Sequence, residues 1–188
     1  MEGGRVHEAL VEQAMRGDAE AFDALARLVG DRCMAIAQRI LRDRDVAEEA
    51  VQTALITAWR DLRSLRDPDR FEPWLHRILT RACYSEVRRR RWSAEVRVLP
   101  GDAARDPRDV LAVEDRDQLE RAFRRLTLEQ RTVLVFRHYL DLPVDEVADH
   151  LGIPVGTVKS RLHHATAALR ASVDADSRNP IVGMERPA

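Results

Sequence analysis

Apolar residues recur every three or four positions along most of this chain, and that spacing is the period of an amphipathic helix. The first half contains four such stretches, at about residues 6–15, 18–40, 45–62 and 71–92. The second half contains four more, at about residues 119–126, 128–140, 144–151 and 158–169. No segment alternates apolar and polar residues over a useful length, as a half-buried strand would. The pattern therefore predicts an all-α protein.

Polar residues mark where several of these helices are expected to begin. Asp18 precedes an apolar stripe and is a candidate N-cap. Asp45 with Glu48, and Thr127 with Gln130, have the spacing of a capping box, in which each side chain bonds the other residue's backbone.

The helix expected from about residue 45 to residue 62 has two unlike faces. The face expected to be buried comprises Val51, Ala54, Leu55, Ala58, Trp59 and Leu62. The opposite face is acidic and polar, with Glu48, Glu49, Gln52 and Thr53. Solvation, together with a favourable interaction with the helix macrodipole, would explain an acidic face near a helix start. A partner-binding surface is the alternative, and these residues alone leave both open.

The segment from residue 144 to residue 169 predicts a helix-turn-helix. Gly152 can adopt the positive φ that ends its first helix, and Pro154 prevents that helix from continuing. After a turn through Thr157, the second helix has one apolar stripe, comprising Val158, Leu162, Ala165 and Leu169. Its polar face carries Lys159, Ser160, Arg161, His163 and His164. A DNA-reading motif fits this pattern, and an ordinary αα-hairpin with a solvated face is the alternative.

The 188 residues have room for two small domains, and the composition, 34% charged and 45% hydrophobic, suits packed amphipathic helices. We predict two helical domains at residues 1–92 and 118–173, a flexible linker at 93–117 and a disordered tail at 174–188. The predicted linker contains Pro100-Gly101 and Asp106-Pro107 and few bulky apolar residues.

The net charge of −1 conceals local patches of opposite sign. Residues 77–92 hold six arginines against one acid, and residues 156–173 hold three basic residues and no acid. The predicted linker holds seven acids against four arginines. A charge run is usually a solvated face, but two patches of unpaired positive charge favour a two-point contact with a phosphate backbone. Tyr84 and Trp92 could stack on bases or pack inside.

Cys33 and Cys83 form no metal-binding or disulfide pattern, and no apolar run is long enough to span a bilayer. We therefore expect a cytoplasmic protein with two reduced thiols and no membrane insertion. A cysteine hydrolase using Cys83 with His76 is disfavoured, because seven residues of helix separate the two by about 10 Å. His163 and His164 lack a third metal ligand at suitable spacing. We expect no enzymatic activity, catalytic residue, metal, cofactor or small-molecule substrate.

Four segments, in this order, resemble the extracytoplasmic-function group of the bacterial sigma-70 family. They read GDAEAFDALARL, DRDVAEEAVQTALITAWRDL, RFEPWLHRIL leading into RRRR, and LTLEQRTVL followed by DEVADHLGIPVGTVKSRLHHATAALR. The resemblance covers about residues 10–172 and implies a sigma factor, which binds core RNA polymerase and directs it to promoters. A dimeric helix-turn-helix regulator is the alternative, and it would require a dimerisation surface and a palindromic site.

The resemblance also implies roles for particular residues. Positions that contact the clamp helices of the polymerase β′ subunit correspond to Asp45, Glu48, Glu49 and Gln52. Positions that read and melt the minus-ten element correspond to Arg63, Arg66, Arg70, Arg77, Arg81, Arg88, Arg89 and Arg91. Positions of the helix that binds the minus-thirty-five element correspond to Thr157, Lys159, Ser160, Arg161, His163 and His164. An anti-sigma factor is a further implied partner, beside polymerase and promoter DNA.

Two departures from the family pattern concern DNA reading. Arg81 and Ser85 stand where the family usually has an asparagine and an aspartate. The pair His163-His164 stands where an aromatic residue and an arginine are frequent. Because histidine is mostly neutral at pH 7, we expect a weaker or pH-dependent contact with the upstream element.

Overall fold

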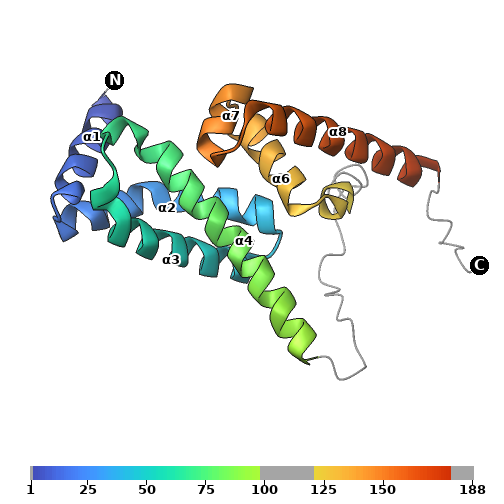
Figure 1. Cartoon of the computed structure of the whole chain (residues 1–188), viewed down its shortest axis with the longest axis horizontal. Coiled ribbons are helices and arrows are strands. Elements are labelled where there is room, and N and C mark those ends of the chain that lie inside the picture. Colours follow the sequence, from blue (N-terminus) through green and yellow to red (C-terminus); the bar gives the residue numbers. More distant parts are fainter. Residues whose placement is uncertain (1, 98–120, 179–188) are drawn as a thin grey trace, which may run out of the picture.

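The computed structural model describes residues 2–97 and 121–178, and within them every regular element is a helix (Figure 1). The N-terminal helices are α1 (Glu2–Met15), α2 (Ala19–Leu41), α3 (Arg44–Asp61) and α4 (Phe71–Arg97), with the short 3-10 turns η1 (Leu62–Ser64) and η2 (Pro68–Arg70) between α3 and α4. The C-terminal helices are α6 (Leu128–Leu134), the π-helical turn η3 (Val135–Tyr139), α7 (Val144–Leu151) and α8 (Val155–Arg178). The all-α prediction is confirmed.

The helix ends confirm two of the three predicted caps. The Asp18 carboxylate accepts from the backbone N–H groups of Glu20 and Ala21, and Thr127 with Gln130 forms the reciprocal capping box. The prediction for α3 is wrong, because this helix begins at Arg44 and its N-cap is Asp43, which accepts from Val46 N–H. Asp45 therefore lies inside the first turn, where its negative charge still interacts favourably with the helix macrodipole.

Two helices continue past their predicted ends. α4 extends through Arg97 and α8 through Arg178, so the first residues of the predicted linker and of the predicted tail are helical. The remainder of both segments, residues 98–117 and 179–188, lies outside the described residues. None of the described helices combines the length and apolar character needed to cross a bilayer.

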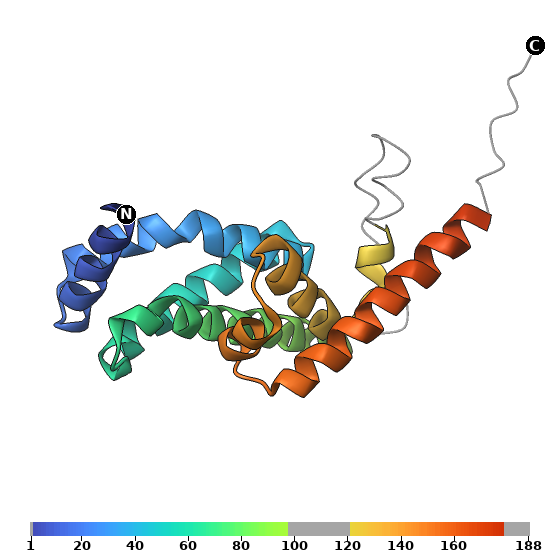
Figure 2. The same cartoon turned by 90° about the horizontal axis from the view of Figure 1, so that it is seen from above.

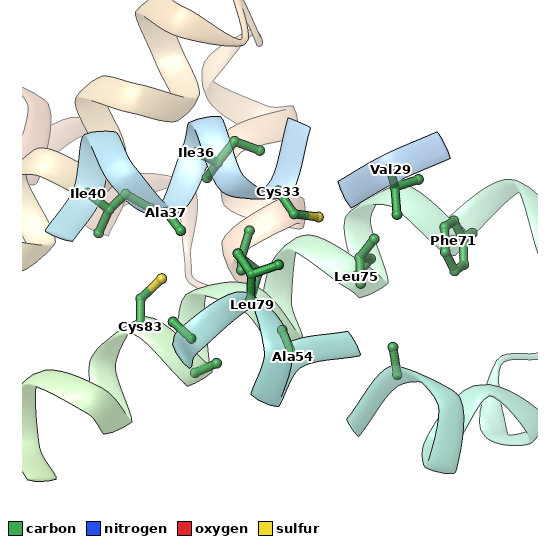
Figure 3. Packing of buried hydrophobic residues seen from close by; sticks show 14 of the residues in the cluster. Val29, Cys33, Ile36, Ala37, Ile40, Ala54, Phe71, Leu75, Leu79 and Cys83 are labelled. Atoms are coloured by element: carbon green, nitrogen blue, oxygen red, sulfur yellow. The ribbon is translucent and has the colours of Figure 1, made fainter. Parts of the chain in front are cut away.

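The N-terminal helices share a core built from the inner faces of α2, α3 and α4 (Figure 3). Ile36 of α2, Ala54 of α3 and Leu79 of α4 are almost completely buried there. The predicted burial of Trp59 is wrong, since its side chain is 40% exposed and packs on Phe22 at the outer edge, with 4.9 Å between ring centroids. Trp59 directly follows the buried Ala58, at the margin of the apolar stripe, where helical spacing alone does not separate the buried side from the exposed side.

The predicted helix-turn-helix is formed by α7 and α8. Gly152 ends α7 with a φ of 65°, and its N–H bonds the carbonyls at the end of that helix. The turn is shorter than predicted, because α8 already begins at Val155 and Pro154 accepts the first helical hydrogen bonds through its carbonyl. Val158 and Ala165 form the fully buried side of α8.

The C-terminal helices pack directly on the N-terminal ones. Phe136, Val147 and Val158 belong to the same apolar cluster as the core of α2, α3 and α4. A smaller cluster of Leu126, Leu134 and Ala165 joins α6 to α8. The far half of α8 projects away from the N-terminal helices in both views (Figures 1 and 2).

Candidate nucleic-acid interface

The predicted polymerase-binding residues lie together on the solvent side of α3. Asp45, Glu48, Glu49 and Gln52 are all exposed, and their spacing places them on one helical face. We call these four residues the acidic face. Glu48 accepts from Arg44 Nε at 3.3 Å, and Glu49 pairs with two arginines of α4. The acidic face is therefore available to a partner only in part, because Glu49 already has intramolecular partners.

An apolar residue extends the acidic face and was missed from the sequence. Ile56 lies one turn beyond Gln52 and is 61% exposed. Trp59, a further turn along, is also exposed. Partner-binding surfaces commonly carry apolar anchors among polar residues. The available signal was an isoleucine at a position that the helical period assigns to the polar side.

The loop between α3 and α4 presents its arginines outward. Arg63 and Arg66 are exposed, and the Arg63 guanidinium lies over Gly17, where any β-carbon would stand only 2.5 Å from it. The φ of 96° at Gly17 is what favours glycine at this turn, because the exposed Arg63 side chain could move aside for a β-carbon. Arg70 differs from the other two, because its guanidinium donates to Asp149 of α7 at 2.7 Å.

The arginines of α4 divide into a free set and a paired set. Arg81 and Arg88 are exposed, form no ion pair within the described residues, and line a shallow surface pocket with Tyr84 and Ser85. Arg89 donates to Glu86 at 2.6 Å and also to Glu49. The expectation of an almost unpaired positive patch is therefore wrong for three of the five described arginines, because acids from α3, α4 and α7 approach them.

The paired set contains two further arginines. Arg90 donates to Asp43, the N-cap of α3, at 3.4 Å and forms an ion pair with Glu49 of α3 at 3.7 Å. Arg77 donates from Nε to the Asp149 backbone carbonyl and from its terminal nitrogen to the Asp149 carboxylate, both at 2.8 Å. The side chain of Arg91 lies outside the described part of the structure.

The two candidate stacking aromatics occupy different environments. Trp92 is 70% exposed on α4. Tyr84 is half-buried, and its hydroxyl donates to Thr132 Oγ1 of α6 at 3.3 Å. Burial raises the pKa of Tyr84, partly opposed by the Thr132 hydrogen bond and by Arg161. Tyr84 therefore packs between the two sets of helices, and only Trp92 is accessible for stacking.

A buried histidine pair closes the contact between α4 and α7. His76 and His150 are 3% and 7% exposed, and their Nδ1 atoms lie 2.8 Å apart. The Phe136 ring stands nearly perpendicular to both histidine rings, with its centroid 5.4 Å from that of His76 and 6.3 Å from that of His150. Burial, assisted by His150 and Arg32, lowers the pKa of His76 to about 3. Burial also lowers the pKa of His150, although nearby acids oppose the shift.

The second helix of the helix-turn-helix is open to solvent. Lys159, Ser160, His163 and His164 are exposed on α8, while Thr157 and Arg161 are half-buried. The two histidine rings meet edge to face at 5.6 Å between centroids. No ion pair occupies Lys159 or Arg161 within the described residues. This helix can therefore enter a DNA groove without first exchanging an internal partner.

The disfavoured hydrolase site does not form. His76 hydrogen-bonds to His150 rather than to Cys83, and both cysteines are buried in the core (Figure 3). Burial raises the pKa of Cys33 to about 11 and that of Cys83 to about 12. Both groups are therefore neutral thiols at pH 7, which is the unreactive form of cysteine.

Family comparisons match both sets of helices. The family model for sigma-70 region 2 matches residues 24–93, and the one for sigma-70 region 4 matches residues 116–169. The chain belongs to the extracytoplasmic-function group of the sigma-70 family. Among its relatives, the sigma factor SigM of Mycobacterium tuberculosis is 32% identical over 178 residues, which cover 89% of this chain and 86% of that protein. SigW of Bacillus subtilis is 29% identical over 179 residues, covering 85% of this chain and 92% of SigW.

Solved sigma factor structures agree with this assignment. RpoE of Bartonella quintana, in complex with the anti-sigma factor NepR, has a TM-score of 0.64 at 25% identity and covers 84% of this chain and 99% of RpoE. CnrH, in complex with the cytosolic domain of CnrY, has a TM-score of 0.63 at 26% identity and covers 91% of this chain and 99% of CnrH. The sigma factor is thus a transcription initiation factor, a class without catalytic activity, that binds core RNA polymerase and directs it to promoters.

Proposed function

We propose that the N-terminal helices bind polymerase and read the minus-ten element, while α6 to α8 read the minus-thirty-five element. The observation that carries this division is the basic face of α8, the second helix of the helix-turn-helix, which is exposed and contains no acidic residue from residue 156 to residue 173. The domain boundaries that follow are residues 1–97 and 118–178, with the intervening residues as the linker. Promoter specificity then depends on two weak readers that the polymerase brings together, since linked weak contacts gain affinity through effective concentration.

The acidic face and Ile56 form the proposed polymerase contact. Carboxylates and one exposed apolar side chain suit a basic helical partner, and the clamp helices of the β′ subunit are the partner that the resemblance implies. Glu48 is the best single test position, because its only described partner is the neighbouring Arg44. We expect Glu48→Lys to weaken core binding at least tenfold with no loss of helix content.

Within α4, Arg81 and Arg88 are the proposed first contacts with the minus-ten strand. Both are exposed beside Ser85, which also departs from the family pattern. Arginine can bond either phosphate oxygens or the acceptor edge of guanine. Arg63 and Arg66 of the preceding loop would hold the displaced strand by its phosphates.

An anti-sigma factor is a proposed regulator. Support comes from RpoE, which resembles this chain along nearly its whole length and was solved in complex with one. A protein encoded beside this sigma factor that blocks its binding to core polymerase in a pull-down assay would identify that regulator.

Run-off transcription from genomic fragments with core polymerase tests the proposed function. We expect promoter-specific transcripts that require the chain and disappear with Glu48→Lys. Asp31→Lys, a matched change of charge at an exposed position of α2, serves as the control and should preserve transcription. Active core enzyme that yields no specific transcript with the wild-type chain would contradict the proposal.

A further inference from the structure

Two of the proposed minus-ten arginines, Arg70 of η2 and Arg77 of α4, bond to α7. The Asp149 carboxylate accepts from both Arg70 and Arg77, at 2.7 and 2.8 Å. Its backbone carbonyl accepts a third hydrogen bond from Arg77. The Asp149 carboxylate thus neutralises and orients both guanidinium groups, and it competes with a DNA phosphate for them. We call this arrangement, with α7 held on the first half of α4, the closed form.

A hydrogen bond between His76 and His150, beside Asp149, also holds α7 on α4, and only one proton fits between the two nitrogen atoms. With the two Nδ1 atoms of His76 and His150 only 2.8 Å apart, one ring must donate and the other must accept. If both rings carry a proton at Nδ1, two donors face each other and the hydrogen bond is lost. Phe136 covers the rings, so water cannot take over the missing contact.

The charged groups around His76 and His150 do not offset the cost of placing a positive charge on these buried rings. From α2, Arg32 adds positive charge, although Glu72 of α4 pairs with it at 3.1 Å. From α7, Glu146 and Asp149 favour protonation of His150, but Asp149 is already engaged by Arg70 and Arg77. From η3, Arg137 turns to Asp141 and Tyr139 lies under Arg39. Burial dominates this balance, and the pKa of both histidines lies below the ordinary value.

We propose that His76 and His150 form a proton-operated latch, which holds α7 on α4 when neutral and releases it when protonated. Release also separates Asp149 from Arg70 and Arg77, so these arginines become available to a nucleic-acid phosphate. That last consequence rests on the proposed function. The opening itself does not, because it depends only on the contact between the two helices.

The direction of the pH dependence follows from proton linkage. The closed form binds fewer protons than the open form, so closure is complete above the ordinary histidine pKa and is lost as pH falls below it. With an ordinary value of about 6.5 for both rings after opening, the ratio of closed to open molecules falls up to about 100-fold between pH 7.5 and 5.5. The shift is independent of DNA and of polymerase.

Small-angle X-ray scattering of the full chain between pH 7.5 and 5.0 tests the latch. The wild type is expected to expand on acidification, while its far-UV circular dichroism stays constant. Asp149→Asn, which weakens closure at every pH, should expand at a higher pH. His150→Gln should expand less than the wild type, because an amide can donate or accept as His76 requires and leaves only one ring to titrate, so the closed-to-open ratio should fall about 10-fold instead of about 100-fold between pH 7.5 and 5.5. His138→Gln, an exposed histidine of η3, is the matched control and should behave as wild type.

Several outcomes would overturn the proposal. The first is equal expansion of His150→Gln and the wild type between pH 7.5 and 5.0. The second is a radius of gyration that stays constant in both the wild type and Asp149→Asn. The third is expansion that coincides with loss of helix content. If His150→Gln is already expanded at pH 7.5, His76→Gln replaces it, and expansion of both at pH 7.5 also rejects the latch. Run-off transcription at constant pH remains a separate test of the proposed function, so the two can fail independently.

Discussion

The two helices proposed to face DNA, α4 and α8, differ in what else holds their positive charges. On α8, Lys159 is exposed and has no internal partner among the described residues. On α4, Arg77, Arg89 and Arg90 each bond at least one acid or carbonyl from another helix. Both helices look alike in sequence as runs of basic residues. Among the described arginines of α4, only Arg81 and Arg88 are as free of internal partners as Lys159 of α8.

The position of each helix in the fold explains this difference. α4 lies between α3 and α7, and acids near the start of α3 and the end of α7 reach its arginines. α8 leaves the N-terminal helices along half of its length (Figure 2), and its own segment from residue 156 to residue 173 contains no acid. The availability of a cation for DNA thus depends on neighbouring helices at least as much as on its own sequence. Competing acids thus hold Arg77, Arg89 and Arg90 of α4 in reserve, whereas Arg81 and Arg88 have no such partner within the described residues.

The largest expected effect comes from truncating Phe136, the side chain at the centre of the contact between α4 and α7. Phe136 is fully buried against His76 and His150, so Phe136→Ala leaves a cavity and should cost about 3–5 kcal/mol in the free energy of unfolding. Urea denaturation followed by circular dichroism measures the loss. Tyr139→Ala, on the same turn but 43% exposed, should cost far less. Equal losses for the two variants would show that Phe136 does not hold the two sets of helices together.

A variant with a smaller expected effect should free Arg70 and Arg77 of their shared partner, so that they resemble the unpaired Lys159 of α8. Asp149→Asn removes the charge that Arg70 and Arg77 share, so the affinity for a single-stranded oligonucleotide should rise up to about tenfold. Each arginine that then contacts a phosphate should steepen the dependence of log affinity on log salt by about 0.7. Fluorescence anisotropy at several salt concentrations measures both quantities.

Asp145→Asn provides the matched control for that experiment. It removes the same charge from the same helix, but Asp145 is exposed and pairs with no arginine within the described residues. An equal gain in affinity for both variants would mean that net charge, rather than release of Arg70 and Arg77, explains the effect.

The sequence predicted the helices and the helix-turn-helix well, because both depend on local signals. Periodic apolar positions, the Asp18 cap and the positive φ of Gly152 act within a few residues of the chain. The cap of α3 was misplaced by two residues because Asp43 and Asp45 are equally suitable by residue type, and only the backbone geometry selects Asp43. The positions of the proposed sites stay predictions, although the structure shows which of their residues are exposed.

The pairing of the arginines could not be predicted from the sequence, because their partners are distant. Asp149 lies 79 residues from Arg70, and Glu49 lies 40 residues from Arg89. His76 was considered only as a partner of Cys83, whereas its actual partner, His150, lies on another helix 74 residues away. Exposed Ile56 was likewise hidden, since one apolar residue on a polar face is common and does not identify a contact by itself.

On α8, the loss of one free cation should have a modest and uniform effect. Lys159→Ala should weaken duplex binding several-fold, whatever the sequence, and reduce the salt slope by about 0.9, as expected for one phosphate contact. Arg170→Ala removes the same charge from an exposed position farther along α8 and serves as the control. The contact is specific to Lys159 only if Arg170→Ala has the smaller effect on the slope.

The smallest expected effect compares two arginines within α4. Arg81 is exposed without an ion pair in the described residues, so Arg81→Ala should weaken binding of the polymerase holoenzyme to a forked minus-ten oligonucleotide about threefold. Arg89 is held by Glu49 and Glu86, and contact with DNA would require it to leave both carboxylates. The cost of breaking those pairs offsets most of the gain from a phosphate contact, so Arg89→Ala should leave binding nearly unchanged. If Arg89→Ala instead weakens binding as much as Arg81→Ala, the polymerase must draw Glu49 away from Arg89, and the reserve on α4 is released by core binding itself.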